Sequence, residues 1–295
     1  MFEEVLWEMG HHYVPQRYLE NFQDPNHPGF IWLHDKRAGV ARLASIEKVA
    51  QVKGYYSEDT ERYLAHEVET PANAVMKKLI DKTPITPAER AHMAYYIGVM
   101  LKRIPARHRH ATEMIPSVLD DVVARIRRQL QETADAIRAD PQVLARRLGE
   151  VDVAAKKFAK EPPPEVVSQI REPWPTVEML QALFGMTWRI LISEGPQYFV
   201  TSDNPAFFFR GWGIGREESE LTFPLSTTHA LHGSRSRAGQ NLVFFKATEP
   251  MVKEFNRRLA SETERLAFYH MRAPWLLKIL PRKSQPLNAI RWRNS

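Results

Sequence analysis

The spacing of apolar residues changes type along this chain, and that change limits the folds open to it. Between about residues 60 and 160, apolar side chains return every three or four positions, which is the period of an amphipathic helix. After Gly195-Pro196 the apolar residues form short β-branched or aromatic runs separated by turn residues, which predicts strands. Helices followed by strands and a last helix favour an α+β fold over repeated βαβ units.

We therefore predict an α+β fold that is predominantly helical, with a small antiparallel β-sheet in the C-terminal half. The expected helices cover residues 60–80, 113–160, 176–193 and 248–268, and a further helix starts at residue 86. The expected strands cover residues 30–33, 198–201, 206–209, 221–225, 230–233, 242–245 and 275–280, and another lies within 46–56.

The clearest local signal is a helix start at Thr86-Pro87-Ala88-Glu89. It combines an N-cap hydroxyl, a proline at the first helical position and a glutamate placed to complete a capping box. Pro105 lies near the expected end of that helix and predicts a kink or break there.

The length of 295 residues allows one large domain or two smaller ones. We assign residues 1–295 to a single domain. The run Pro162-Pro163-Pro164 leaves open a subdivision into a mainly helical half, 1–161, and an α+β half, 165–295.

Composition excludes several classes of protein. Cysteine is absent, so disulfides, thiolate metal sites and a cysteine nucleophile are ruled out, and a reducing compartment such as the cytoplasm is expected. No apolar run approaches the roughly 18 residues of a membrane span. The net charge of +6 permits nucleic acid as a partner.

Two adjacent histidines, His11 and His12, are the most informative polar feature. They precede a short helical pattern that begins near Pro15, where a missing N–H costs nothing. Histidine can transfer protons or bind a metal. The alternative is structural: His12 caps the helix or bonds a buried backbone group, and His11 is exposed.

A second candidate segment is Thr201-Ser202-Asp203-Asn204-Pro205, at the end of an apolar strand. A rigid strand end can aim the short carboxylate of Asp203 into a pocket. The same residues also suit an Asx turn, and Asn204 before proline favours an extended backbone. Both interpretations stay open at this stage.

Glu69 lies beside the apolar stripe of its helix and needs a partner if it is buried. Arg103 could supply that partner structurally, or its planar fork could bind a phosphate. Other basic residues are candidates for nucleic-acid contact, or a solvated helix end: Lys102, Arg107, Arg109, Arg125 and Arg128.

Several segments resemble, in order, a bacterial family catalogued as domain of unknown function 4238. They are His11 to Phe22, Leu64 to Glu69 with Ala72, Lys102 to Arg107, Phe199 to Pro205, Phe223 to Ser226, and Asn256. The resemblance covers nearly the whole chain but brings no established reaction. Some members look to be encoded in bacterial defence islands against phage, which implies an effector that acts on nucleic acid or a nucleotide.

The first functional hypothesis is a phosphoester hydrolase acting on nucleic acid or a nucleotide. Its site would gather His11, His12, Glu69, Arg103, Asp203 and Asn204. It allows a divalent metal, with His11, His12 and Asp203 as candidate ligands. The alternative is a non-catalytic nucleic-acid- or protein-binding module or sensor, in which the same polar set is structural.

Overall fold

The computed structural model of this protein describes residues 10–209, 217–235 and 241–280. The chain forms two compact units: a main unit of Met1–Ile104 with Pro173–Ser295, and a hairpin unit of Pro105–Glu172. These bounds differ from the division considered at residues 161–165, and the single-domain assignment stays a prediction. About 51% of the chain is helical and 19% is strand, so it is predominantly helical, as predicted.

The described strands of the main unit form three sheets. The strands are β1 (Gly10–His12), β2 (Phe30–Asp35), β3 (Val40–Ser45), β4 (Gln51–Lys53), β5 (Thr187–Ile192), β6 (Thr201–Ser202), β7 (Phe207–Phe208), β8 (Glu220–Pro224), β9 (His229–Ser234), β10 (Leu242–Lys246) and β11 (Leu266–Tyr269). The sheet orders are β10-β5-β9-β8-β7, β3-β2-β11-β6 and β1-β4.

The prediction of one small antiparallel sheet in the C-terminal half is only partly confirmed. Strands β5, β7, β8, β9 and β10 do come from that half, but β10 and β5 run parallel. The four-stranded sheet is antiparallel, yet it takes β2 and β3 from the N-terminal part of the chain. Pairing between distant segments of this kind leaves no local pattern in the sequence.

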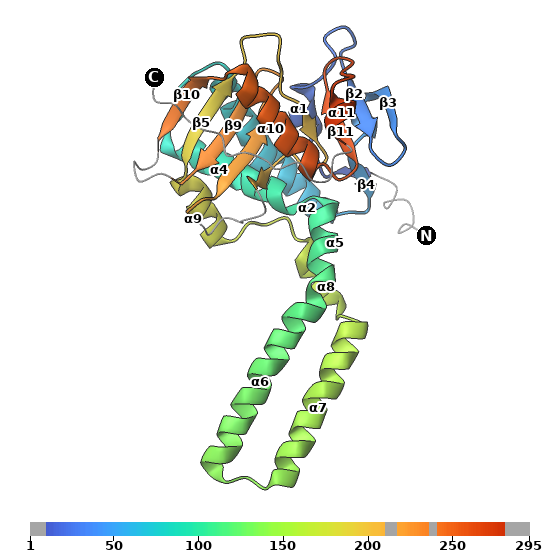
Figure 1. The fold of residues 1–295 in the computed structure, drawn as a ribbon, viewed down its shortest axis with the longest axis vertical. Helices are drawn as coiled ribbons and strands as arrows, with labels where there is room; N and C mark the ends of the chain where they lie inside the picture. The colour runs from blue at the N-terminus through green and yellow to red at the C-terminus, as the bar shows by residue number, and fades with distance from the viewer. Residues whose placement is uncertain (1–9, 210–216, 236–240, 281–295) are drawn as a thin grey trace. The chain divides into compact units, whose positions relative to one another are not determined.

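Helices cover both faces of the five-stranded sheet (Figure 1). On one face, α10 (Glu249–Glu262) places Val252 and Phe255 against Leu191 of β5. On the other, Trp188 and Ile190 join the main core with residues of α4 (Pro87–Lys102) and α9 (Val177–Gly185). Because β5 is apolar on both faces, its sequence lacks the alternation that identifies a half-exposed strand.

A continuous helical run from residue 58 to residue 80 contains a π-helix. It consists of α2 (Glu58–Tyr63), the π-helix η3 (Leu64–Glu69) and α3 (Thr70–Ile80). The Thr70 backbone N–H and hydroxyl both donate to the carbonyl of Ala65, five residues back. Pro71 explains the wide turn, because its ring would clash with the carbonyl of Glu67 in a regular α-helix.

The predicted start of α4 is confirmed. Thr86 accepts a hydrogen bond from the Glu89 N–H, and the Glu89 side chain accepts one from the Thr86 N–H, which completes the capping box. Farther along α4, Gly98 allows a close approach. A Cβ atom at Gly98 would lie 2.7 Å from Cβ of Pro175, just before α9. The predicted break is confirmed too, since α5 (Pro105–Glu113) starts at Pro105.

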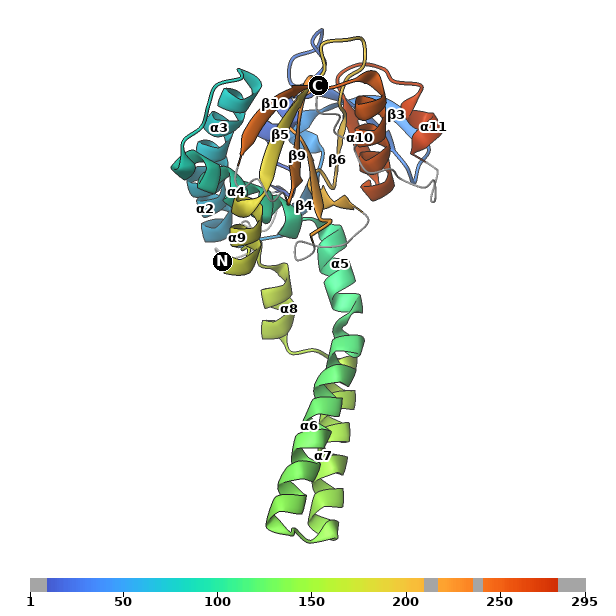
Figure 2. The same cartoon turned by 60° about the vertical axis from the view of Figure 1, so that its left-hand side comes forward.

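The hairpin unit contains two long helices that lie side by side and antiparallel, α6 (Ile115–Ile137) and α7 (Pro141–Lys160) (Figures 1 and 2). Arg127 of α6 pairs with Asp152 of α7. No residue of either helix is buried. The segment expected to be helical over 113–160 is interrupted: the chain turns at Arg138, with φ of 51°, and the helix restarts after the N-cap Asp140.

Two further helices end earlier than expected, and one expected strand is a helix. The helix expected over 176–193 stops at Gly185 and is followed by β5. The helix expected over 248–268 stops at Glu262, before β11. The strand expected over 275–280 is the short helix α11 (Leu276–Ile279). The remaining helices are α1 (Gln16–Glu20), the 3-10 helix η2 (Ile46–Lys48) and α8 (Pro164–Arg171).

Candidate functional site

His11 lies in β1 and is buried, unlike the exposed His11 of the structural interpretation. Its Nδ1 accepts a hydrogen bond of 3.0 Å from the backbone N–H of Tyr56, and the two rings stack with centroids 6.5 Å apart. Nδ1 is therefore the unprotonated nitrogen. This contact fixes the segment after β4 against β1.

His12 is half-buried and faces a different set of groups. Its Nε2 donates to the carbonyl of Glu47 at 3.2 Å, and the Gln16 amide nitrogen lies 3.4 Å from its Nδ1. Burial, opposed by the bond to Glu47, lowers the pKa of His12. The ring is therefore neutral at pH 7 and can act as a base or an acceptor.

Arg103, the C-cap of α4, is fully buried and ties three segments together. Its Nη1 lies 2.6 Å from Oε1 of Glu69, and its Nη2 donates to the carbonyl of His12. The Tyr56 hydroxyl donates to the Arg103 carbonyl at 3.2 Å. The predicted Glu69–Arg103 pair therefore forms, and it joins the π-helix to β1.

Three residues of this cluster, Tyr56, Glu61 and Tyr96, were not predicted. Oε2 of Glu61 is buried without a hydrogen-bond partner, and burial raises the pKa of Glu61 even though the charge of Arg103 lowers it. The Tyr96 hydroxyl is also buried and unpartnered. Glu61 precedes Glu69 by two helical turns, a spacing that could have indicated it. The arginine network below means His11, His12, Tyr56, Glu61, Glu69, Tyr96 and Arg103.

Asp203 is almost completely buried beyond β6, where it holds the start of β11. Its two carboxylate oxygens accept backbone N–H bonds from Glu264, Arg265 and Leu266 at 2.7–3.0 Å. Burial raises the pKa of Asp203 to about 6, against the lowering effect of these three bonds. Each carboxylate oxygen of Asp203 thus already accepts at least one backbone hydrogen bond.

Asn204 has the same kind of role. Its amide donates to the carbonyl of Glu262 at 3.1 Å, and its N–H donates to Oγ of Ser202. Within the described residues, no hydrogen bond or ion pair links Asp203 or Asn204 to the arginine network. The structure thus gathers His11, His12, Glu69 and Arg103 but gives Asp203 and Asn204 separate contacts.

The residues proposed as metal ligands do not form a metal site in the described part of the chain. No group of three or more His, Cys, Asp or Glu side chains is placed there to hold an ion. Asp203 binds backbone N–H groups and His11 binds Tyr56, so neither offers that contact atom to a metal.

The basic candidates are spread over both units. Lys102 belongs to α4 of the main unit, whereas the other four lie in the hairpin unit and are exposed: Arg107, Arg109, Arg125 and Arg128. The hairpin unit carries 12 Lys and Arg against 11 Asp and Glu, so its charge is nearly balanced. Proteins that bind polyanions usually present a strongly cationic face. The nearly balanced charge of the hairpin unit does not indicate such a face.

A second buried polar cluster lies between β8, β9 and α10. Oε2 of Glu220 accepts from Arg258 at 2.8 Å and from His232 at 3.1 Å, and the Arg258 guanidinium stacks 3.7 Å from the Phe209 ring centroid. Burial acts to raise the pKa of Glu220, but His232 and Arg258 outweigh it and lower that pKa. His232 and Arg258 are fully buried, so this cluster ties α10 to the sheet.

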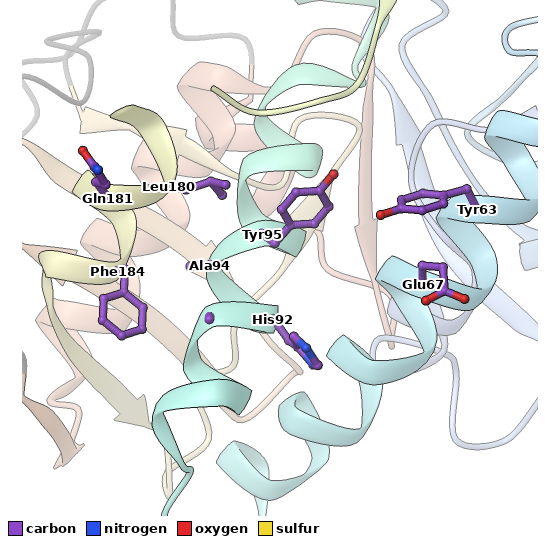
Figure 3. A pocket seen from close by; sticks show the side chains of 9 residues that line it. Tyr63, Glu67, His92, Ala94, Tyr95, Leu180, Gln181 and Phe184 are labelled. Carbon is purple, nitrogen blue, oxygen red and sulfur yellow. The ribbon is translucent and has the colours of Figure 1, made fainter. Parts of the chain in front are cut away.

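The main unit also has an open pocket of about 560 Å³, which we call the tyrosine pocket (Figure 3). It lies between the α2–η3 run, α4 and α9. Its lining residues are Tyr63, Glu67, Ala91, His92, Ala94, Tyr95, Leu180, Gln181 and Phe184. The sequence analysis identified none of them as site residues, because they are separate surface positions on three helices.

The polar groups of the tyrosine pocket come from facing helices. Figure 3 shows the hydroxyl end of Tyr63 pointing toward Tyr95. Burial raises the pKa of Tyr95, so its hydroxyl stays neutral. Glu67 and His92 extend from η3 and α4 into the lower part of the pocket. Phe184 and Leu180 of α9 form the apolar wall.

The model of one protein family matches residues 10–273, described as protein of unknown function (DUF4238). The chain belongs to this DUF4238 family. The match includes both units and every segment on which the resemblance was based. No curated protein and no solved structure matches the chain. Within the described residues of this DUF4238 chain, no helix is both long enough and apolar enough to span a membrane.

Proposed function

We propose that this DUF4238 chain is a non-catalytic binding module whose ligand site is the tyrosine pocket. The observation that carries the proposal is the burial of Arg103, which is 0% exposed and already paired with Glu69 and the His12 carbonyl. Nη1 and Nη2 of Arg103 are engaged, and its Nε is unpartnered but buried, so no part of the guanidinium is open to a phosphate from solvent. The saturated carboxylate of Asp203 supports the same structural role.

The tyrosine pocket supports binding by its size and by its lining. Small-molecule sites are usually concave, about 300–1,000 Å³ in volume, and mostly apolar with a few convergent polar groups. A volume of about 560 Å³, an apolar wall and five polar side chains drawn from the α2–η3 run, α4 and α9 fit that description.

The test uses the full chain and three aromatic probes of similar size: benzyltrimethylammonium, benzyl alcohol and benzoate. Ligand-observed NMR should detect at least one of them, with one site per chain. Ala91→Trp, which puts an indole on the pocket lining, should abolish that binding. Ala88→Trp, an exposed substitution on the same helix outside the pocket, should leave it unchanged. Binding of none of the probes, or equal binding to both variants, overturns the proposal.

Phosphoester hydrolysis of nucleic acid or a nucleotide is the second candidate function. It is favoured by Glu61, whose raised pKa and unpartnered Oε2 suit a general acid beside the guanidinium of Arg103. The half-exposed, neutral His12 would act as the base in this scheme. A role in defence against phage belongs to this candidate and rests on the family resemblance alone.

Hydrolysis is tested with the purified full chain, nucleic-acid and nucleotide substrates, and Mg²⁺, Mn²⁺ or Zn²⁺ in turn. Activity should fall at least tenfold in His12→Gln and Glu61→Gln, while Glu58→Gln, an exposed change in the same helix as Glu61, should have no effect. Activity that is absent, or that is unaltered by both substitutions, rejects this assignment.

A further inference from the structure

We propose that the tyrosine pocket binds organic cations, because its lining brings the carboxylate of Glu67 to the same side of the pocket as the aromatic rings of Tyr63 and Tyr95. The inference rests on the proposed binding function and adds the chemical class of the ligand: an amine, a quaternary ammonium or another positively charged group on a compact apolar body.

Glu67 supplies the negative charge, and the π-helix determines where it points. Glu67 and Glu69 are two residues apart, so they extend from nearly opposite faces of η3. Glu69 turns inward to Arg103, whereas Glu67 is exposed and lines the pocket. Within the described residues Glu67 has neither an ion pair nor a hydrogen bond, so its charge is uncompensated.

Aromatic rings supply the second attraction. The side chains of Tyr63 and Tyr95 extend toward each other from α2 and α4, and Phe184 lines the α9 side of the pocket (Figure 3). The edge of Trp174 packs on Tyr63, with ring centroids 5.2 Å apart, which holds the exposed tyrosine in place. A cation within about 6 Å of such rings gains roughly 0.5–2 kcal/mol from their quadrupoles.

The lining of the pocket contains no Lys or Arg, and His92 is its one basic side chain. The guanidinium of Arg90 lies 5.8 Å from the ring centroid of Phe184. Arg90 is buried there and donates to the carbonyls of Phe184 and Met186. An anionic ligand would face Glu67 without a counter-charge, so the site should select against it.

The experiment compares dissociation constants of the three probes used above for the full chain. Benzyltrimethylammonium should bind at least fivefold more tightly than benzyl alcohol, and benzoate should bind most weakly. Glu67→Gln keeps the side-chain shape and removes the charge, so it should weaken binding of the cation about tenfold and bring it near the affinity of benzyl alcohol. Glu58→Gln is the matched control and should have no effect.

The outcomes separate this inference from the proposed function. If benzyl alcohol or benzoate binds as tightly as the cation, and Ala91→Trp abolishes that binding, the pocket binds ligands but the cation inference is wrong. A cation affinity that is unchanged in Glu67→Gln also overturns the inference. If no probe binds in the pocket, both proposals fail.

Discussion

Oε1 of Glu69 lies 2.6 Å from Nη1 of Arg103, although 34 residues separate the two along the chain. The pair joins the end of the π-helix to the end of α4. Because Arg103 also donates to the His12 carbonyl, one buried guanidinium connects α4 to both the π-helix and β1. Removing it should therefore affect stability before it affects any function.

Arg103→Leu should lower the free energy of unfolding by about 3–5 kcal/mol, as expected when one partner of a buried ion pair is lost. Urea denaturation followed by circular dichroism measures the change. Arg17→Leu breaks an exposed pair with Glu20 and should leave stability nearly unchanged. A loss below about 1 kcal/mol in Arg103→Leu would argue against a structural role.

Asp203 should make the protein less stable as pH rises. Its folded-state pKa of about 6 exceeds the unfolded value near 3.9, so the folded state holds the proton more tightly. The resulting stabilisation is complete below pH 4 and is lost as pH rises through 6. A shift of about two units corresponds to about 3 kcal/mol.

The measurement compares urea unfolding of the native chain and Asp203→Asn at several values between pH 3.5 and 7.5. Relative to this non-titrating variant, the native chain should lose stability across that range. If its relative stability instead increases with pH, the three N–H bonds outweigh burial and the pKa is lowered.

Two glycine-to-alanine changes in helices should act in opposite directions. Gly98→Ala places a Cβ atom 2.7 Å from Pro175 and should cost about 1–3 kcal/mol through overpacking. Gly149→Ala in α7 meets nothing within 4 Å and should stabilise its helix by about 0.5–1 kcal/mol. Native-state hydrogen exchange measures the effect of Gly98→Ala in the main unit and the effect of Gly149→Ala in the hairpin unit. Equal tolerance of both changes would show that α4 can move away from Pro175.

Asn256 of α10 bridges two backbone groups in the segment just before β6. Its Oδ1 accepts from the Val200 N–H at 3.1 Å and its Nδ2 donates to the Tyr198 carbonyl at 2.8 Å. Asn256→Leu keeps the size but leaves both groups unpaired, which should cost about 2–4 kcal/mol in urea denaturation. Asn26→Leu, in an exposed turn, should be close to neutral, and a similar loss in both variants would contradict this account.

Local signals predicted the helices well, and their ends less well. The capping box at Thr86 located α4 because its bonds lie within four residues. Strand β5 was mistaken for helix because both its faces are buried, so its periodicity is absent. The turn at Arg138 was overlooked although Asp140-Pro141 is itself a helix-start signal. The remaining strand pairings and helix ends depend on packing against distant segments, which a single sequence does not reveal.

The candidate site could likewise be predicted from the sequence only in part. The Glu69–Arg103 pair could be anticipated, because a buried carboxylate needs a cationic partner. The binding of Asp203 to the backbone of residues 264–266 could not, because main-chain N–H groups carry no residue-type signal. The tyrosine pocket was missed since Tyr63, Tyr95 and Phe184 look like ordinary surface positions of separate helices.

Because the π-helix Leu64–Glu69 positions the pocket residues, the proposed binding surface depends on the number of residues in this segment as well as on their types. Deleting one residue there, such as His66, would rotate Tyr63 by about 100° relative to Glu69. Tyr63 would then leave Tyr95, while the Glu69–Arg103 pair could persist. Insertions and deletions between Ser57 and Pro71 should thus alter ligand binding even where every lining residue is kept.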